Sequence, residues 1–388
     1  MDRKSWFKNA VIYHILIDRF AGYSSIKNWE KPEFIGGNIP ALIQKIPYLK
    51  DLGVTTVWIS PFYKTSAYHG YHITDFYSVD PHFGTTKDIE DLISAIHQNN
   101  MYIIADFVPN HLSQHHSFFK QAQANKTSPY YNWFTFTQWP KQYQCFLSVK
   151  DIPKINLHHT DAKNHIINAA VYWLEKGFDG YRIDHVIGPS QQFLKEFNTA
   201  IKSEFPNTIL IGEAWMQGIK ANELSTLQIK HPTINYLFSK YLSDNLLKQY
   251  INIIDGVLDF SFQQYIKKYS VHQKYSYNKL ILKLQRHYKR FPDTFYLPTF
   301  LDNHDMDRFL FSCNNSKEKL KEAISIQFKQ HQPAIIYYGT EIGMSQQKSI
   351  YSNHSHGDIQ ARQPMNWDSI DSDLFHFYKN TIKNKKNN

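Results

Sequence analysis

Acidic side chains follow several predicted strands of this chain, and their positions give the first indication of chemistry. They are Asp106, Asp184, Glu213, Asp302 and Asp305. In an α/β barrel the carboxyl ends of the strands meet on one face, where catalytic groups are placed. Several acids on one face are costly to bury without a purpose. Such a cluster suits glycoside hydrolysis, in which one carboxylate attacks the sugar, one protonated acid donates to the leaving oxygen and a third charge stabilises the transition state.

The stretch around Asp184 is the clearest of these strand ends. Residues 178–183 form a short apolar run that predicts a buried strand, and Asp184 follows it directly. Arg182 precedes Asp184 by two residues, so strand alternation places both side chains on one face. A structural ion pair between them is the alternative interpretation of this stretch taken alone. No Cys–His or Ser–His–Asp arrangement competes for the catalytic role.

A helix is predicted immediately before this strand, over residues 161–176. Its apolar residues Ile166, Ala169, Ala170, Trp173 and Leu174 recur at helical spacing. Asp161 is expected to cap its start and Gly177 to end it.

The same alternation of strand and helix recurs along the chain. Strands are predicted over residues 10–18, 54–60, 101–107, 178–183, 208–212, 256–260, 295–301 and 334–338, and the most regular helices over residues 39–52, 86–99 and 374–383. Thr85 and Asp88 resemble a capping box for the second of these helices. Eight βα units predict a closed α/β TIM barrel. An open doubly wound sheet is the alternative, but no Gly-x-Gly-x-x-Gly fingerprint follows any strand.

The domain prediction places a small inserted domain after the third strand, over residues 112–157. That region is aromatic and polar with little helical period, and long insertions in α/β units are usually functional. Residues 1–111 and 158–383 are predicted to form the two parts of the barrel, and residues 384–388 a polar tail. The chain is expected to carry no C-terminal β-sandwich.

Composition narrows the class of protein further. The net charge is +9, but the lysines are scattered, so we expect no nucleic-acid partner. The two cysteines, Cys145 and Cys313, argue against a disulfide scaffold or a cysteine zinc site. The apolar run at residues 11–17 lacks the features of a signal peptide, and no segment is apolar enough to span a membrane. We therefore expect a cytoplasmic protein without a membrane partner, whose oligomeric state the sequence leaves open.

Five short motifs, in the same order, give the chain a resemblance to the α-amylase superfamily, glycoside hydrolase family thirteen. They occupy residues 106–111, 152–156, 180–184, 212–213 and 301–305. The Pro-Lys-x-Asn form of the motif at residues 152–156 is similar to the neopullulanase and cyclomaltodextrinase branch. The resemblance covers nearly the whole chain. It implies a retaining α-glucan hydrolase acting on α-1,4 bonds of maltooligosaccharides or starch-like glucans through a covalent glycosyl-enzyme intermediate.

The resemblance also implies catalytic roles. Asp184 would be the nucleophile, Glu213 the general acid and then base, and Asp305 the residue that holds the sugar hydroxyls at the transition state. Asp106 would be a structural partner of Arg182 and not a catalyst.

Four further residues would bind the substrate by the same resemblance. Arg182 would orient Asp184 and keep it ionised. His111 and His304 would bind hydroxyls of the sugar being cleaved, and Tyr71 would stack on its ring.

One departure from the family pattern lies just after the expected nucleophile. Calcium-dependent amylases often carry Lys-His three and four residues after the nucleophile, where this chain has Ile187 and Gly188. Calcium prefers several oxygen ligands, and Asp151 is the only acid within residues 112–157, so no cofactor is required and calcium is weakly supported.

Two alternatives keep the fold: a transglycosylase or sugar isomerase acting at the same site, and a non-catalytic binding protein.

The two main acids are expected to titrate differently. Arg182 should favour ionised Asp184, whereas the segment that carries Glu213 contains no cation. Two nearby carboxylates also push each other's pKa values apart. The sequence therefore predicts that the pKa of Glu213 lies above that of Asp184.

Overall fold

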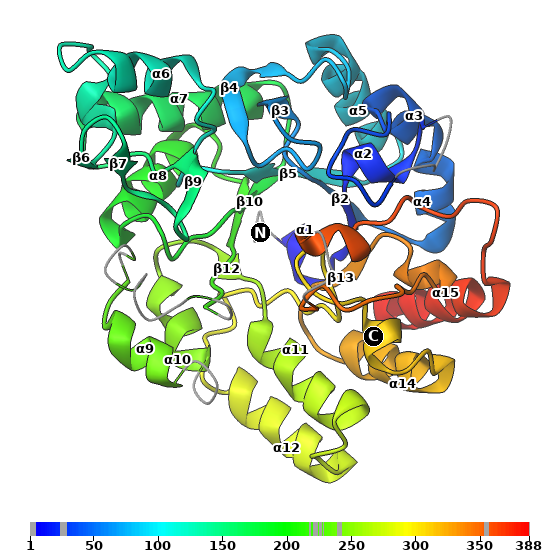
Figure 1. Ribbon diagram of the computed structural model, residues 1–388. Helices are drawn as coiled ribbons and strands as arrows, with labels where there is room; N and C mark the ends of the chain where they lie inside the picture. Colours follow the sequence, from blue (N-terminus) through cyan, green and yellow to red (C-terminus); the bar gives the residue numbers. More distant parts are fainter. Residues whose placement is uncertain are drawn as a thin grey trace. The chain divides into compact units, whose positions relative to one another are not determined.

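The computed structural model describes residues 5–23, 29–216, 229–238, 243–352 and 357–387, together with residues 219, 224 and 227 (Figure 1). The chain divides into two compact units. The first comprises Met1–Ser60, His82–Ile104 and Leu258–Asn388, and the second comprises Pro61–Pro81 and Ala105–Val257. The boundary crosses strand β5, Tyr102–Phe107, which contributes residues to both units.

Parallel strands form the centre of the first unit. They are β1 (Val11–Ile15), β2 (Thr56–Ile59) and β13 (Ala334–Tyr337). Strand β1 lies between the other two, with Ile12 opposite Ile335 on one side and Thr56 on the other. Every residue of these three strands is buried, as expected for parallel strands covered on both faces.

Helices surround these strands along the chain of the first unit. They are α1 (Ser5–Lys8), α2 (Ile17–Phe20), α3 (Ile39–Gln44), α4 (Ile46–Leu52), α5 (Thr86–Gln98), α11 (Phe260–Ile266), η4 (Lys267–Val271), α12 (Tyr277–Tyr288), α13 (Phe309–Ser312), α14 (Lys317–Phe328), η5 (Thr340–Ile342), η6 (Gly357–Gln360) and α15 (Ser372–Asn387). The predicted capping box is confirmed at α5, where Thr85 and Asp88 bond reciprocally. The α5 residues Ile89, Leu92, Ile93 and Ile96 are buried along one face.

The second unit is also built on parallel strands. Strand β11 (Ile209–Gly212) lies between β10 (Gly180–Ile183) and β12 (Gly256–Val257). The helices of this unit are α6 (Ser117–Ala124), η1 (Tyr131–Trp133), α7 (Thr160–Glu175), α8 (Gln191–Glu204), α9 (Pro232–Phe238), α10 (Ser243–Leu247) and η3 (Lys248–Tyr250). Helix α7 leads into β10 through Gly177, whose φ of 109° suits the expected helix end.

Small antiparallel pairs complete the second unit. Strands β3 (Tyr63–Thr65) and β4 (Ile73–Val79) form one pair, which the sequence did not predict. Within residues 112–157, β6 (Phe136–Gln138) pairs with β7 (Gln142–Tyr143), and β8 (Cys145–Phe146) with β9 (Val149–Pro153). This region returns to the end of β5, because His111 and Lys154 form an isolated antiparallel bridge.

Several predicted boundaries were wrong. Strand β1 ends at Ile15 and is followed by the short helix α2, so Asp18 lies in a helix and not in a strand. The helix predicted over residues 39–52 is two helices, α3 and α4, because Pro47 has no N–H to continue the first. Asp161 does not cap α7; His159 is the capping residue, and its side chain forms no capping hydrogen bond.

Residues 295–301 do not form the predicted strand. Pro298 removes one backbone donor from this segment, and a single parallel bridge joins Thr299 to Ala334. The segment still bonds on both sides, because Pro298 O accepts from Asp259 N at 3.0 Å and Thr299 O from Ile335 N at 2.8 Å. The predicted strand is therefore replaced by an irregular segment that lies beside β13.

The last helix continues beyond its predicted end at residue 383. Helix α15 runs to Asn387 and includes residues that the sequence assigned to a polar tail. Lys385 explains the extension, since its Nζ atom donates to Gln330 O and Gln332 O at 2.8 and 2.9 Å.

Candidate active site

The ends of three strands bring an arginine and three carboxylates together in the second unit. Asp106 lies in β5, Arg182 in β10, and Asp184 and Glu213 follow β10 and β11. Backbone bonds align these ends: Asp184 N donates to Phe107 O at 2.8 Å, and Glu213 N donates to Ile183 O at 2.9 Å. All four side chains are buried, so their charges interact strongly.

Arg182 contacts all three acids of this cluster. Its Nη1 atom lies 2.8 Å from Asp106 Oδ1 and 2.9 Å from Asp184 Oδ1, and its Nη2 atom contacts Glu213 Oε1. Burial alone would lower the pKa of Arg182, but the charges of Asp106, Glu213 and Asp184 hold it well above its ordinary value. The guanidinium is therefore a permanent cation at the centre of the cluster, and the expected pairing of Arg182 with Asp106 is confirmed.

The contact between Arg182 and Glu213 corrects the electrostatic argument made from the sequence. That argument gave Glu213 no cationic neighbour, because none lies in its own segment. The structure supplies one from the adjacent strand, so the same guanidinium stabilises the ionised forms of both Asp184 and Glu213. The predicted order of their pKa values stays a prediction, and it now depends on their mutual repulsion, since the two side chains are almost equally buried.

Tyr71 joins the cluster through Asp106. It lies between β3 and β4, and its hydroxyl donates to Asp106 Oδ2 at 2.8 Å. This bond fixes the orientation of the phenol ring, of which little is exposed. Its proposed stacking on a sugar stays a prediction.

Two buried histidines flank the acids, and only the first was predicted. His111 follows β5, and burial lowers its pKa to about 3, with the charges of His72 and Lys154 acting in the same direction. His185 follows Asp184 with a left-handed φ of 45°, and its backbone N–H donates to Glu213 Oε2 at 3.3 Å. Burial, with the charges of His111, Lys154 and Arg182, holds the pKa of His185 well below its ordinary value. Both rings are therefore neutral near pH 7.

Phe146 of β8 contacts both of these histidines. Its ring centroid lies 4.7 Å from that of His111 and 4.6 Å from that of His185. The region predicted as an insertion thus supplies an aromatic side chain beside the acid cluster. No local pattern indicated this residue, because its partners are distant along the chain.

The first unit holds the remaining predicted site residues. His304 Nε2 lies 3.1 Å from Asp305 Oδ2, and Arg362 Nη2 lies 2.7 Å from Asp305 Oδ1. Arg362 also bonds to Asp358 Oδ2 at 2.8 Å and to His304 O at 2.9 Å. Arg362 was not predicted as a site residue, although its spacing of four residues from Asp358 was a usable signal.

Asp302 has a structural role in the same unit. Its Oδ2 atom accepts from Phe309 N at 2.8 Å, at the start of α13, and Thr340 Oγ1 lies 3.2 Å from its Oδ1 atom. Burial raises its pKa above the ordinary value. These contacts occupy the carboxyl group within the protein, so we assign it no catalytic role.

Among the residues that the structure describes, no group of three or more His, Cys, Asp or Glu side chains is arranged to hold a metal ion.

A comparison with family models decides the family. The model described as the catalytic domain of alpha amylase matches residues 14–384, which contain the acids around Arg182 and the residues around Asp305. The chain belongs to the alpha-amylase family.

Relatives within the alpha-amylase family match almost the entire chain. "Alpha-amylase 2" of Dictyoglomus thermophilum is 34% identical over 98% of this chain and 64% of its own length. "Neopullulanase 2" of Thermoactinomyces vulgaris is 27% identical over 97% of this chain and 63% of its own length. The chain thus spans less than two thirds of the length of these relatives. The expected similarity to the neopullulanase and cyclomaltodextrinase branch is confirmed, since enzymes with both names match.

Solved structures of family members have the same fold. The alpha-amylase of Geobacillus thermoleovorans complexed with acarbose superimposes with a TM-score of 0.80 at 26% identity, covering 98% of this chain and 79% of that one. A cyclomaltodextrinase superimposes with a TM-score of 0.83, also at 26% identity, covering 99% and 64%. In the described part of the present chain, no helix is long and apolar enough to cross a membrane.

Proposed function

We propose that the chain hydrolyses α-1,4 bonds in maltooligosaccharides or related glucans with retention of anomeric configuration. The observation that carries this proposal is the contact of Arg182 with both Asp184 and Glu213. Retaining hydrolysis requires two carboxyl groups near one sugar bond, one ionised and one protonated. A shared permanent cation holds two such groups close together in a buried site.

The reaction takes place in two steps. In the first, the Asp184 carboxylate attacks the anomeric carbon, while Glu213 donates its proton to the departing glycosidic oxygen. In the second, Glu213 removes a proton from water, which displaces Asp184 and releases the sugar with its original configuration. Arg182 keeps Asp184 ionised in the free enzyme, and Asp106 helps to hold the guanidinium by accepting from the same Nη1 atom.

The remaining predicted residues bind the substrate. We assign His111 and His304 to sugar hydroxyls, and neutral His111 can both donate and accept a hydrogen bond. Tyr71 supplies a ring whose hydroxyl is already bonded to Asp106, so its orientation is fixed before the sugar binds. Asp305 holds sugar hydroxyls, and Arg362 and His304 fix its carboxylate.

We also propose that the strands close into an eight-stranded barrel, with residues 295–301 as its irregular seventh strand. The backbone bonds of Pro298 and Thr299 on both sides support this assignment. Barrel closure would bring the catalytic strand ends onto one face.

Product analysis tests the function. The purified protein is incubated with maltoheptaose, soluble starch, pullulan and cyclodextrins, and the products are separated by size. We expect shorter maltooligosaccharides from at least one substrate. Products longer than the starting oligosaccharide would favour transglycosylation, and no cleavage of any substrate by folded protein would contradict the proposal.

A further inference from the structure

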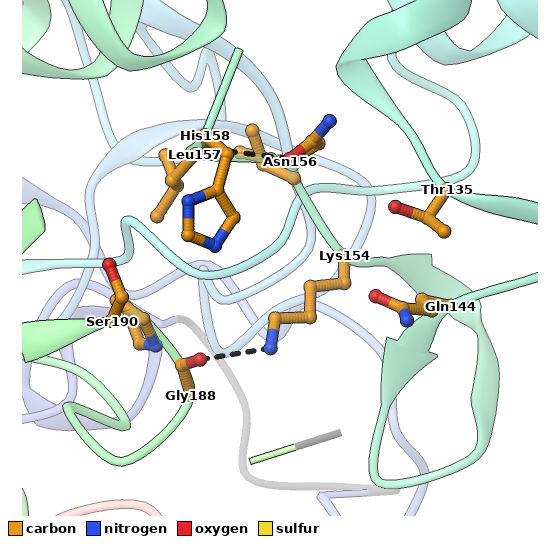
Figure 2. Close-up of a pocket in the computed structure, with 10 residues that line it drawn as sticks. Thr135, Gln144, Lys154, Asn156, Leu157, His158, Gly188 and Ser190 are labelled. Carbon is orange, nitrogen blue, oxygen red and sulfur yellow. Dashed lines mark hydrogen bonds between the residues drawn. The ribbon is translucent and has the colours of Figure 1, made fainter. Parts of the chain in front are cut away.

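Lys154 is a buried lysine whose ammonium group bonds to the loop after β10. It follows β9, and only 8% of its surface is exposed. Its Nζ atom donates to Gly188 O at 2.9 Å, four residues after Asp184 (Figure 2). The bond therefore joins residues 112–157 to the segment that carries the proposed nucleophile.

The backbone of Lys154 is itself held firmly. Its N–H donates to Gln144 O at 2.9 Å, and the residue lies opposite His111 in an antiparallel bridge. The next residue, Ile155, donates to Asn110 O at 3.0 Å. The lysine side chain therefore extends from a rigid base beside the end of β5.

Gly188 is tightly enclosed at the other end of this bond. A Cβ atom at Gly188 would lie 2.2 Å from Asn110 Oδ1 and 2.7 Å from His185 Cδ2, so no side chain fits there. The N–H of Gly188 donates to His185 O at 2.9 Å, and the N–H of His185 lies 3.3 Å from Glu213 Oε2. A continuous series of short contacts thus runs from Lys154 to the proposed acid, through the residue that adjoins Asp184.

Stability alone does not explain a lysine at this position. Burial lowers the pKa of Lys154 to about 8, which shows that the protein interior disfavours its charge. A methionine of similar length would avoid that cost but would leave the Gly188 carbonyl without this donor. The benefit of the lysine therefore lies in this hydrogen bond and in the loop that the bond holds.

We propose that Lys154 is a positioning residue, which holds the loop of residues 184–188 so that Asp184 and Glu213 keep their catalytic geometry. This inference rests on the proposed function. It assigns to residues 112–157 an indirect part in the reaction, through the hydrogen bond of Lys154 to the backbone carbonyl of Gly188.

The test compares Lys154→Met with the matched control Lys150→Met, which removes an exposed lysine from β9. We expect kcat of Lys154→Met on maltoheptaose to fall about 10- to 100-fold, because a small misplacement of catalytic groups has effects of this size. KM should change much less, and the thermal midpoint should fall by no more than a few degrees, because the cost of burying the charge is removed together with the hydrogen bond. Hydrogen–deuterium exchange of residues 184–190 should become faster in this variant only.

The outcomes separate positioning from simple structural support. Lys154→Arg retains a donor for Gly188 O, and the pocket of about 240 Å³ beside Lys154 offers room for the longer side chain, so it should recover most of kcat (Figure 2). A Lys154→Met variant with unchanged kcat and unchanged exchange would overturn the proposal. So would a loss of kcat matched by a lower thermal midpoint and faster exchange throughout the chain. If the unsubstituted protein cleaves no glucan, the proposed function fails, whereas the exchange comparison still tests whether Lys154 holds the loop.

Discussion

Arg182 Nη2 contacts Glu213 Oε1, although Arg182 lies within β10 and Glu213 follows β11. The same guanidinium also binds Asp184, so one cation is shared by the proposed nucleophile and the proposed acid. The geometry makes the two carboxyl groups dependent on each other and on Arg182. Substitutions of Arg182, Asp184 and Glu213 should therefore change the activity in different ways.

Asp184→Asn should abolish turnover and leave the fold intact. The amide keeps the shape of the side chain but cannot attack the anomeric carbon. We expect kcat on maltoheptaose to fall by at least about 10⁴-fold, as for loss of other nucleophiles, with an unchanged circular dichroism spectrum. Asp161→Asn, an exposed position in α7, is the control. An Asp184→Asn variant that keeps more than a few per cent of activity would remove Asp184 from the nucleophile role.

Glu213→Gln should affect substrates according to their leaving group. The amide cannot donate a proton, so cleavage of natural glucans should slow by about 100-fold or more. Substrates with a fluoride or nitrophenolate leaving group need little protonation, and their first step should slow much less. Steady-state and burst kinetics on both substrate classes measure the difference, with Glu175→Gln as an exposed control. Equal slowing on both classes would show that another group is the acid.

Arg182→Lys should reduce activity strongly, although the substitution keeps the positive charge. A lysine ammonium cannot reach Asp106, Asp184 and Glu213 at once, because it lacks the planar fork of donors. We expect kcat to fall about 100-fold or more. Arg182→Met should in addition lower the free energy of unfolding by about 3–5 kcal/mol, because it leaves buried carboxylates without a counterion. Arg286→Lys in α12 is the exposed control, and an active Arg182→Lys enzyme would contradict the shared-cation account.

The sequence predicted the acid cluster better than it predicted the contacts within it. Asp184 and Glu213 were placed correctly because short buried runs precede them, and Arg182 was paired with Asp184 because strand alternation puts them on one face. The contact of Arg182 with Glu213 depends on the register of neighbouring strands, which no local pattern encodes.

The same limit applies to the fold, because local sequence patterns predict contacts between near neighbours but not contacts between distant segments. The capping box at Thr85 was predictable because its two side chains lie three residues apart. The end of α15 was not, since Lys385 stabilises it through carbonyls about fifty residues away in the sequence. Pro47 interrupts the helix predicted over residues 39–52, and Pro298 interrupts the strand predicted over residues 295–301. Both could have been anticipated, because proline lacks a backbone N–H donor.

Stability should fall as the pH is lowered through the titration of His116. This residue precedes α6, and its Nδ1 atom accepts from Phe118 N at 3.2 Å, which requires the unprotonated ring nitrogen. Burial lowers its pKa to about 4, with His165 acting in the same direction and Asp75 opposing it. The unfolded chain therefore binds more protons between pH 4 and about 6.5, so stability is present above that range and is lost as the pH falls.

The variant His116→Asn isolates this effect. Asparagine can still cap the helix but does not titrate. From the pKa difference, His116 should account for about 2 kcal/mol of the stability lost between pH 7.5 and pH 5. Urea unfolding at the two pH values should show a correspondingly smaller loss for His116→Asn, with the exposed His115→Asn as the control. An identical pH dependence in His116→Asn and the unsubstituted protein would contradict the assignment.

The most direct test of the proposed mechanism is peptide mass spectrometry on Glu213→Gln after reaction with α-maltosyl fluoride. The fluoride leaves without help from an acid, whereas release of the glycosyl group needs Glu213 as a base, so the covalent intermediate should accumulate. After an acid quench and proteolysis, we predict a maltosyl group attached to Asp184. A maltosyl group on any other carboxylate, or turnover of the fluoride without a detectable adduct, would contradict Asp184 as the nucleophile of a retaining enzyme.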